Sequence, residues 1–283
     1  MNFNSDVTVI IPCFNDGKYV LEALNSIFNQ TLQAVKIIIV DDGSNVETQK
    51  ILKTIYNPNV QIIHQENKGV SNARNTGINL ATTDYILTLD ADDYFEPSFI
   101  EKSVKVLNEN ENVGVVGSWV KILKNNIFEE EIKKPLGGGV KDFVLKNNGI
   151  SGSMFRKECW LTASGFDIKM AHGYEDWEFW IAILSHNWFM HILQEPLFIY
   201  RQKAFSRNQK ALNFFDFELR KYIFLKHKLI FETHFEFYAL ELLRQNSVLR
   251  MDVAQKKNSK EYEIGRFFLA PFRFLKRILI FTK

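Results

Sequence analysis

The sequence predicts an α/β protein built on a mostly parallel β-sheet that helices cover on both faces. Short apolar runs rich in Val and Ile recur through the first third of the chain. They alternate with segments whose apolar residues recur at helical spacing. Strands that are buried on both faces form continuous apolar runs of this kind, which is typical of parallel sheets lying between layers of helices.

Five strands are predicted in this first part of the chain. They cover residues 7–11, 35–40, 60–64, 85–89 and 113–116. Pro12 closes the first strand, and the apolar residues from Val20 to Phe28 then recur at helical spacing. A second helix is predicted over 71–81. Pro97 suits the first turn of the helix that follows the fourth strand.

The second half is less regular up to residue 150, after which helical signals return. Trp177, Trp180, Ile181 and Leu184 mark one helix, and residues 211–250 predict one or two long helices. We therefore expect a main domain at 1–210, a helical extension at 211–265 and a separate tail at 266–283.

Composition excludes several classes of protein. The 283 residues are 46% hydrophobic and 24% charged, which excludes a disordered or low-complexity chain. Two cysteines, Cys13 and Cys159, cannot form a disulfide framework, and their use fits a reducing compartment. The sequence shows neither a secretory start nor an uncharged apolar run of membrane-spanning length, so we expect a cytoplasmic protein.

The small net charge of +2 is unevenly distributed. Residues 266–283 contain five basic side chains and no acidic one, so the rest of the chain carries −3. No nucleic-acid-binding face is therefore expected on the main domain. In the tail, Phe268, Phe272, Leu275 and Leu279 share one helical face, which is typical of a helix lying on an anionic membrane surface. The alternative is a helix packed on the domain, and Pro271 weakens a continuous helix.

Polar clusters follow three of the predicted strands, at residues 13–17, 41–44 and 90–93. Because ligands bind at the carboxyl ends of the strands in such sheets, we expect one common site there. Asp90, Asp92 and Asp93 supply only oxygen ligands, which favour Mg²⁺ or Mn²⁺. Alternatively, Asp93 caps the next helix and the other two carboxylates face water.

The remaining candidate residues each have a functional and a structural interpretation. Asp41 and Asp42 form a second acidic pair or a simple turn. Arg74 and Lys68 suit phosphate binding or belong to a solvated helix face. Glu175 and Asp176 either begin a helix, where the dipole favours carboxylates, or include a general base in an aromatic-lined pocket.

Taken in order, these clusters resemble glycosyltransferase family 2 of the inverting GT-A enzymes. The resemblance covers roughly residues 6–206. The matching segments are Val9-Ile10-Ile11-Pro12-Cys13-Phe14-Asn15, Val40-Asp41-Asp42-Gly43-Ser44, Asn67-Lys68-Gly69-Val70-Ser71-Asn72-Ala73-Arg74-Asn75-Thr76-Gly77, Leu89-Asp90-Ala91-Asp92-Asp93 and Gly173-Tyr174-Glu175-Asp176.

The resemblance implies that the chain binds a nucleotide-diphosphate sugar across the strand ends, with residues 1–120 as the donor half and 121–210 as the acceptor half. The donor-binding residues that it implies are Pro12, Phe14, Asn15, Asp41, Asp42, Lys68, Arg74, Asp90 and Ala91. Within this set, Pro12, Asp42 and Asp41 are expected near the base, and Lys68 and Arg74 near the base and diphosphate.

The same resemblance implies a metal site and a catalytic base. Asp92 would ligate Mn²⁺ or Mg²⁺, with Asp90 near the ribose or the water shell of the metal. Asp176 would take the proton of the acceptor hydroxyl. Glu175, Trp177 and Arg201 are expected on the acceptor side. Tyr200-Arg201 matches a further element, after which histidine is frequent. Lys203 stands near that place here, where it could contact the diphosphate.

The function implied is an inverting glycosyltransferase that acts on a saccharide or lipid-linked acceptor, in the synthesis of a surface polysaccharide or glycolipid. It would work in the cytoplasm or peripherally on the inner face of the membrane. Two alternatives stay open on the sequence: a non-catalytic nucleotide-sugar-binding protein of the same fold, and a metal-dependent phosphoryl-transfer enzyme that uses Asp90 and Asp92.

Overall fold

The computed structural model describes residues 6–203 and 206–269. The chain divides into two compact units, Met1–Glu232 and Thr233–Lys283. The strands are β1 Val7–Cys13, β2 Lys36–Asp42, β3 Val60–Gln65, β4 Tyr85–Thr88, β5 Tyr94–Phe95, β6 Val113–Lys124, β7 Ile127–Lys133, β8 Met154–Arg156 and β9 Phe189–Gln202. The helices are α1 Gly17–Phe28, α2 Val46–Leu52, α3 Val70–Leu80, α4 Phe99–Glu109, α5 Val140–Phe143, α6 Lys157–Thr162, α7 Glu175–Leu184, α8 Arg207–Lys210, a π-helical turn η1 Ala211–Phe215, α9 Asp216–Lys226, α10 Lys228–Thr233 and α11 Phe235–Lys257.

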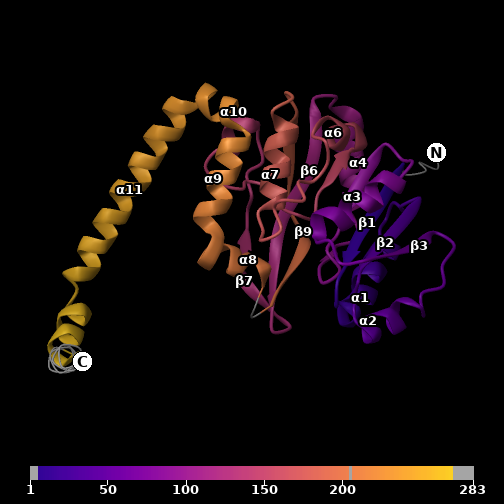
Figure 1. Ribbon diagram of the computed structural model, residues 1–283, viewed down its shortest axis with the longest axis horizontal. Coiled ribbons are helices and arrows are strands. Elements are labelled where there is room, and N and C mark those ends of the chain that lie inside the picture. The colour runs from indigo at the N-terminus through magenta and orange to yellow at the C-terminus, as the bar shows by residue number, and fades with distance from the viewer. Residues whose placement is uncertain (1–5, 204–205, 270–283) are drawn as a thin grey trace. The chain divides into compact units, whose positions relative to one another are not determined.

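One sheet organises the first unit (Figure 1). Its order is β3-β2-β1-β4-β8-β6-β9-β5, with β7 paired to β6. Strands β1 to β4 are mutually parallel, and β8 runs antiparallel to both β4 and β6. The α/β class and the five predicted strands are confirmed. Their positions follow from apolar runs such as Val7–Cys13, whose seven residues are all buried.

The strand order places a topological switch point between β1 and β4. After β1 the chain adds β2 and β3 on one side, and β4 then pairs with the opposite edge of β1. The connections therefore leave the sheet in opposite directions at this point, and a crevice opens beyond the carboxyl ends of the two strands. Residues 13–17 and 90–93 follow those two ends.

Strand β6 and the start of helix α4 differ from the sequence prediction. Strand β6 runs to Lys124 because it pairs in parallel with the long strand β9, whereas the apolar run predicted a strand ending at 116. Pro97 lies before α4 and not in its first turn, since the helix begins at Phe99. The carbonyl of Pro97 instead accepts a hydrogen bond from the amide of Thr31 at 2.7 Å.

Apolar side chains from β1, β2 and β4 form the main core together with helices α1 and α4. A second apolar layer surrounds α7, in which every residue from Trp177 to Leu184 is buried. Phe155 of β8 packs edge-on against Phe179 and Trp180. This packing fixes the beginning of α7 at the sheet, with Glu175 and Asp176 in its first turn.

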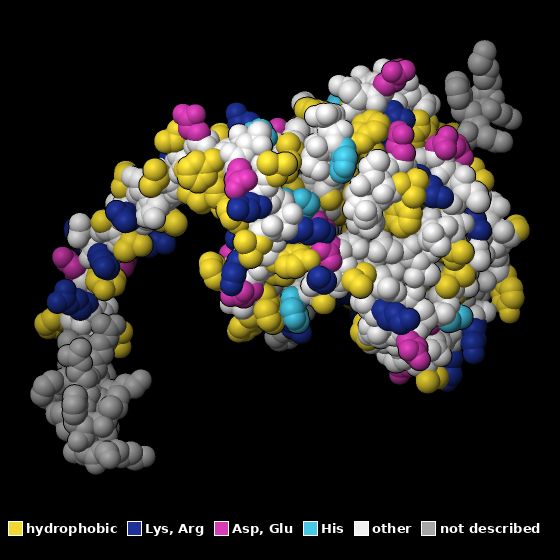
Figure 2. Space-filling model, turned by 45° about the horizontal axis from the view of Figure 1, so that its top comes forward, with side chains coloured by type: hydrophobic (Ala, Val, Ile, Leu, Met, Phe, Trp, Pro, Cys, Tyr) yellow, Lys and Arg dark blue, Asp and Glu magenta, His cyan; other side chains and the backbone are white. Residues whose placement is uncertain are grey.

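The described part of the second unit, up to residue 269, is helical. Helix α11 has 23 residues, and residues 260–269 are also helical. Its exposed apolar side chains, such as Leu240 and Leu249, alternate with charged ones around the helix (Figure 2). No helix among residues 6–203 and 206–269 is both long enough and apolar enough to cross a membrane. Most of the tail predicted to lie on a membrane, residues 270–283, falls outside the described part of the chain.

Candidate active site

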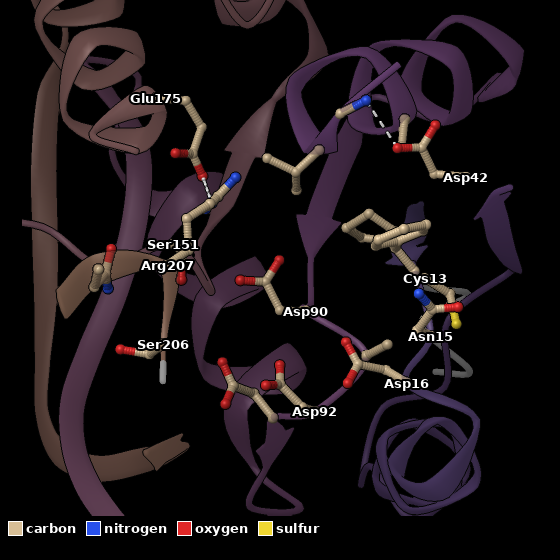
Figure 3. A pocket seen from close by; sticks show the side chains of 18 of the residues that line it. Cys13, Asn15, Asp16, Asp42, Asp90, Asp92, Ser151, Glu175, Ser206 and Arg207 are labelled. Atoms are coloured by element: carbon tan, nitrogen blue, oxygen red, sulfur yellow. Dashed lines mark hydrogen bonds and ion pairs between the residues drawn. The ribbon is translucent and has the colours of Figure 1, made fainter. Parts of the chain in front are cut away.

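A cavity of about 670 Å³ opens at the carboxyl ends of β1 and β4. The loop after β1, the loop after β4, the start of α7 and the end of β9 with the residues following it all contribute to its wall (Figure 3). Of the predicted site residues, the lining includes Pro12, Phe14, Asn15, Asp42, Asp90, Ala91, Asp92, Glu175, Asp176 and Arg201. Segments that are far apart in the sequence thus meet in one cleft.

Asp42 organises one end of the cavity. Its Oδ1 accepts hydrogen bonds from the amide of Lys68 at 2.9 Å and from the Gln65 side chain at 2.7 Å. Its Oδ2 accepts from the amide of Gly69 at 2.8 Å. Gly69 has a φ of +86°, a conformation that other residues rarely adopt, and this turn directs two successive amides at one carboxylate. Asp42 thereby holds the loop that leads into α3 against the end of β2.

Asp41 points to the other side of β2 and is not part of the described lining. Its carboxylate accepts from the amide of Ser44 and lies 2.9 Å from Nδ1 of His64. Burial alone would raise the pKa of Asp41, but the contacts with Ser44 and His64 outweigh it and the pKa is lowered. Asp41 therefore shapes the turn after β2, and its predicted contact with the donor stays a prediction.

Phe14 and Asn15 form the wall next to Asp42. The Phe14 side chain is 47% exposed, so an aromatic face is open at the cavity. Asn15 adopts a left-handed φ of 60°, and its side chain accepts from the amide of Asn45 at 2.7 Å. Its own amide donates to Ser44. These contacts lock the loop after β1 to the loop after β2.

Three acidic side chains form another part of the lining, which we call the acidic wall. Asp16, Asp90 and Asp92 all line the cavity, and Figure 3 shows their carboxylates near one another. Burial raises the pKa of Asp92, and the charges of Asp16 and Asp90 raise it further, against the effect of Lys203. Lys203 lies 2.8 Å from the Asp92 carboxylate and also pairs with Asp16.

Asp93 is a structural member of the cluster. It is buried, and its Oδ1 accepts a hydrogen bond from the amide of Arg201 at 2.8 Å. Its Oδ2 has no hydrogen-bond partner. Burial, followed by the charges of Asp92 and Asp90, raises its pKa well above the ordinary value. Asp93 thus ties β9 to the loop after β4 and does not cap a helix.

The donor chemistry of this wall suits a hard divalent cation. Asp90 and Asp92 offer oxygen atoms only, and their local excess of negative charge favours a cation. The described residues contain no group of three or more His, Cys, Asp or Glu side chains arranged to hold a metal ion. An ion bound here would accordingly take one or two protein ligands and complete its shell with phosphate oxygens and water, a mode that Mg²⁺ commonly adopts.

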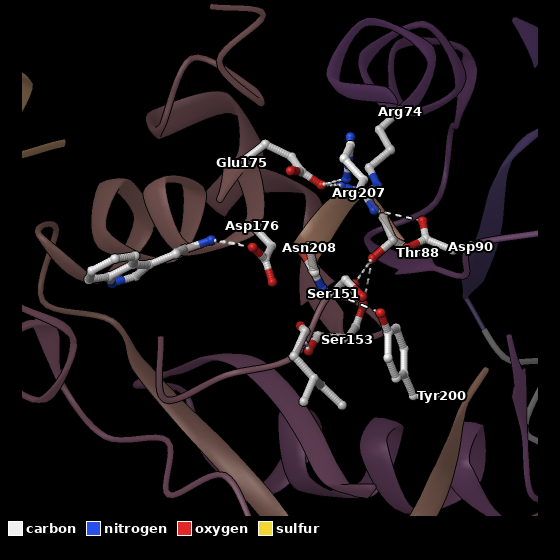
Figure 4. A network of polar contacts seen from close by, with 12 residues as sticks. Arg74, Thr88, Asp90, Ser151, Ser153, Glu175, Asp176, Tyr200, Arg207 and Asn208 are labelled. Carbon is white, nitrogen blue, oxygen red and sulfur yellow. Dashed lines mark hydrogen bonds and ion pairs between the residues drawn. The ribbon is translucent and has the colours of Figure 1, made fainter. Parts of the chain in front are cut away.

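A network of ion pairs links the acidic wall to the first turn of α7 (Figure 4). The Arg74 guanidinium, 1% exposed, lies 2.6 Å from Asp90 and 2.9 Å from Glu175. Arg207 also contacts Glu175, at 2.5 Å. Although burial opposes it, the charges of Arg207 and Arg74 lower the pKa of Glu175 to about 2. Glu175 is therefore an ionised anchor for two arginines.

Asp176, the next residue, has the opposite electrostatics. Its side chain lines the cavity, with Oδ2 accepting from Asn147 and Oδ1 from the amide of Trp177, each at 2.8 Å. Burial, assisted by the charge of Glu175, raises the pKa of Asp176 to about 6 despite Arg74 and these hydrogen bonds. Two adjacent carboxylates thus have pKa values shifted in opposite directions, a pattern found where one of them exchanges protons.

Three predicted site residues, besides Asp41, lie outside the described lining. Lys68 reaches Asp42 through its backbone amide, Arg74 is enclosed by two carboxylates, and Trp177 is buried with its Nε1 donating to the carbonyl of Phe143. Arg201 lines the cavity but pairs with Glu22. The ligand contacts expected of Lys68, Arg74, Trp177 and Arg201 therefore stay predictions.

Sequence reasoning missed several residues that shape the cleft. Ser151 and Arg207 line the cavity, and Asn147 supports Asp176. Asn147 precedes Asn148-Gly149, a sequence that indicates only a turn. No local pattern distinguishes these residues, because each acquires its place through contacts with a distant segment.

Comparisons with known proteins agree with this geometry. Residues 8–159 match the model of the family described as glycosyl transferase family 2. An uncharacterised glycosyltransferase of Methanocaldococcus jannaschii, MJ1057, is 30% identical over 69% of this chain and 70% of its own length. Glycosyltransferase GlyG of Streptococcus pneumoniae is 35% identical over 40% of the chain, and the match spans 38% of GlyG. Chondroitin synthase of Escherichia coli is 40% identical over 34% of the chain, but the match spans only 14% of that synthase.

Solved structures confirm the fold. TarS of S. aureus, residues 1–349 in complex with UDP-GlcNAc, superposes with a TM-score of 0.61 at 19% identity, and the match covers 72% of this chain and 61% of that 1–349 chain. The complex of the same TarS segment with UDP gives a TM-score of 0.63 at 19% identity over 91% of this chain and 76% of the TarS segment. The architecture is therefore the GT-A fold, and the family match over more than half of the chain settles the class: this protein is a glycosyltransferase that belongs to glycosyltransferase family 2.

Proposed function

We propose that the protein transfers a glycosyl group from a nucleotide-diphosphate sugar to an acceptor hydroxyl, with inversion at the anomeric carbon and with Asp176 as the general base. One observation carries the proposal: a carboxylate of raised pKa, Asp176, shares a single cavity with Asp42 and with the acidic pair Asp90 and Asp92. The cavity volume of about 670 Å³ suits a ligand of this size.

The donor half is supported by the open Phe14 ring, the Asp42 loop and the acidic wall. An aromatic face and a carboxylate that already organises backbone amides suit a nucleobase. The TarS structures with UDP-GlcNAc and UDP make UDP-sugars the first donors to test. Asp92, with Asp90 beside it, would hold Mn²⁺ or Mg²⁺, which when bound supplies Lewis-acid stabilisation of the leaving diphosphate.

The acceptor half is supported by the position of Asp176 at the start of α7. Its carboxylate, held by Asn147, takes the proton of the acceptor hydroxyl as the oxygen bonds to the anomeric carbon. The bond from that carbon to the diphosphate oxygen breaks on the opposite face, which inverts the configuration. Glu175 holds Arg207 at the cavity, and the positive charge of Arg207 would compensate for the negative charge that develops on the leaving group.

The decisive test is Asp176→Asn, compared with Asp84→Asn, which changes an exposed aspartate outside the lining. A base of this kind is worth roughly 10²- to 10⁴-fold in rate. We expect the Asp176 variant to lose transfer by about that factor and to bind donor like the unmodified protein. Full transfer activity in this variant would remove Asp176 from the role.

A donor panel distinguishes the alternatives. Transfer to acceptor or slow donor hydrolysis supports glycosyl transfer. Donor binding without any turnover indicates a binding protein, and release of inorganic phosphate from phosphate esters indicates phosphoryl transfer. We further propose a saccharide or lipid-linked acceptor in surface polysaccharide or glycolipid synthesis, a role that the similarity to chondroitin synthase supports.

We also propose that residues 266–283 attach the protein peripherally to the inner face of the membrane. Five basic side chains lie in this segment, and Phe267, Phe268 and Leu269 are exposed. Deletion of 266–283 should abolish co-sedimentation with vesicles containing anionic lipid. Equal sedimentation of both forms would reject the attachment.

A further inference from the structure

Lys203 stands between two carboxylates at the acidic wall of the cavity. Its ammonium lies 2.8 Å from Oδ2 of Asp92, pairs with Asp16 and lies 5.1 Å from the centre of the Tyr19 ring. It follows the last residue of β9, while Asp16 immediately precedes α1. The contact therefore joins residues that are 187 positions apart in the chain.

The neighbouring cations are engaged elsewhere. Arg74 is held by Asp90 and Glu175, away from Asp92. Arg201 donates to the backbone carbonyl of Asp92 and pairs with Glu22, so it does not neutralise the Asp92 carboxylate. Among the described residues, Lys203 is thus the cation that pairs with the carboxylates of both Asp92 and Asp16. The lysine lines the cavity and is 35% exposed, so its ammonium is accessible to solvent and ligand.

The same carboxylate oxygens cannot hold an ammonium and a divalent cation at once. At contact distance the two like charges repel strongly where water is partly excluded. A lysine suits a removable occupant of such a site because its charge is compact and its four-carbon stem is flexible. The negative charges of Asp16 and Asp90 near Asp92 also favour a cation at this position.

We propose that Lys203 is a tethered counter-cation that occupies Asp92 in the donor-free protein and competes there with free divalent metal. Lys203 leaves the Asp92 carboxylate only when the metal binds together with the donor diphosphate. The negative charge of the diphosphate then compensates for the charges of both the metal ion and the lysine. Metal binding and donor binding are consequently coupled, and free Mn²⁺ binds weakly without donor. The inference rests on the proposed function, since it takes Asp92 as the metal ligand.

The test measures Mn²⁺ binding to the donor-free protein, from the loss of the electron paramagnetic resonance signal of aqueous Mn²⁺. Lys203→Met removes the charge at nearly constant length. Its matched control is Lys121→Met, which removes a lysine of 36% exposure that pairs with Glu96. We expect Lys203→Met to bind Mn²⁺ at least about tenfold more tightly than the unmodified protein, and the control to be unchanged. Equal or weaker binding by Lys203→Met would overturn the proposal.

Two further variants keep the outcome interpretable. Lys203→Gln retains a hydrogen-bond donor for Asp92 without the charge, and it carries the same expectation if the methionine variant does not fold. Adding Asp92→Asn to either variant should remove the increase in affinity for Mn²⁺. If Mn²⁺ binds tightly but independently of Asp92, the metal placement in the proposed function is wrong. If binding depends on Asp92 but not on Lys203, only the competition proposed here fails.

Discussion

The side-chain amide of Asn147 donates a hydrogen bond of 2.8 Å to the carboxylate of Asp176. Asn147 lies between α5 and β8, 29 residues before Asp176. A hydrogen bond to a carboxylate favours its charged form, so Asn147 opposes the burial that raises the pKa of Asp176. The loop before β8 thereby controls both the orientation and the basicity of the proposed base.

Asn147→Ala should raise the pKa of Asp176, because the charged form loses a stabilising donor. We expect the acid limb of the pH profile of kcat/KM to move to higher pH and kcat at high pH to fall by about three- to tenfold. Asn110→Ala, which removes a surface amide that bonds to the carbonyl of Val106, serves as the control and should leave the profile unchanged. An unshifted acid limb in Asn147→Ala would contradict the role.

The unmodified enzyme should lose activity as the pH falls through about 6. Asp176 must be deprotonated to accept the proton of the acceptor, and its pKa is raised to about 6. The pH dependence of kcat/KM reports the ionisation of the free enzyme. With saturating metal, the logarithm of kcat/KM should therefore rise with a slope of one up to about pH 6 and then level off. An acid limb near pH 4 would indicate an ordinary exposed carboxylate instead.

Glu175→Gln should move that limb in the opposite direction, to lower pH, because the charge of Glu175 helps to raise the pKa of Asp176. It should also lower the free energy of unfolding by about 3–5 kcal/mol, since buried Arg74 loses one of its two partners. The pKa of Glu175 is lowered from 4.5 to about 2, so its contribution to stability is complete above pH 4.5 and is lost as the pH falls towards 2.

Denaturant unfolding at several pH values checks the stability part of this prediction. The difference in the free energy of unfolding between the unmodified protein and Glu175→Gln should become smaller below pH 4.5. Glu218→Gln removes a 68% exposed partner of Lys221 and should leave stability nearly unchanged. A constant difference from pH 7 to pH 3 would mean that the lost stability does not come from the charge of Glu175.

Asp92→Asn should reduce transfer as strongly as excess chelator does, and the two effects should not add. The reason is that both remove the proposed cation from the diphosphate. The check is to measure the rate of glycosyl transfer from donor to acceptor, with and without chelator, for the unmodified enzyme and for Asp92→Asn. Undiminished turnover of the unmodified enzyme in excess chelator would exclude a required metal.

Gly77→Ala should destabilise the fold by about 1–3 kcal/mol because α3 packs closely on the sheet. A Cβ at this position would lie 2.7 Å from Cγ2 of Ile10 and 3.2 Å from Cγ2 of Val40. Gly139→Ala is the matched control, since a Cβ there meets nothing within 4 Å. Denaturant midpoints of the two variants decide the matter, and equal midpoints would show that α3 can shift away from β1 and β2.

Much of the structure of residues 1–120 could be predicted from the sequence. The apolar runs at 7–11 and 35–40 correspond to β1 and β2, because a run rich in Val and Ile is stable chiefly when it is buried on both faces. That pairing also places residues 13–17 and 41–44 at one edge. The long strand β9 was not predicted, because it alternates buried and exposed positions irregularly along its 14 residues.

The sequence by itself determined the class of fold, the family and the set of carboxylates at the strand ends, since periodicity and short motifs depend only on neighbouring residues. Tertiary structure alone decided what each of these side chains does. Arg74 meets Glu175 across 101 positions, Asp93 accepts from Arg201 across 108, and Lys203 reaches Asp16 across 187. Strand order and burial determine which of these distant residues meet. The resulting contacts set the pKa values of the side chains, and no local sequence pattern indicates them.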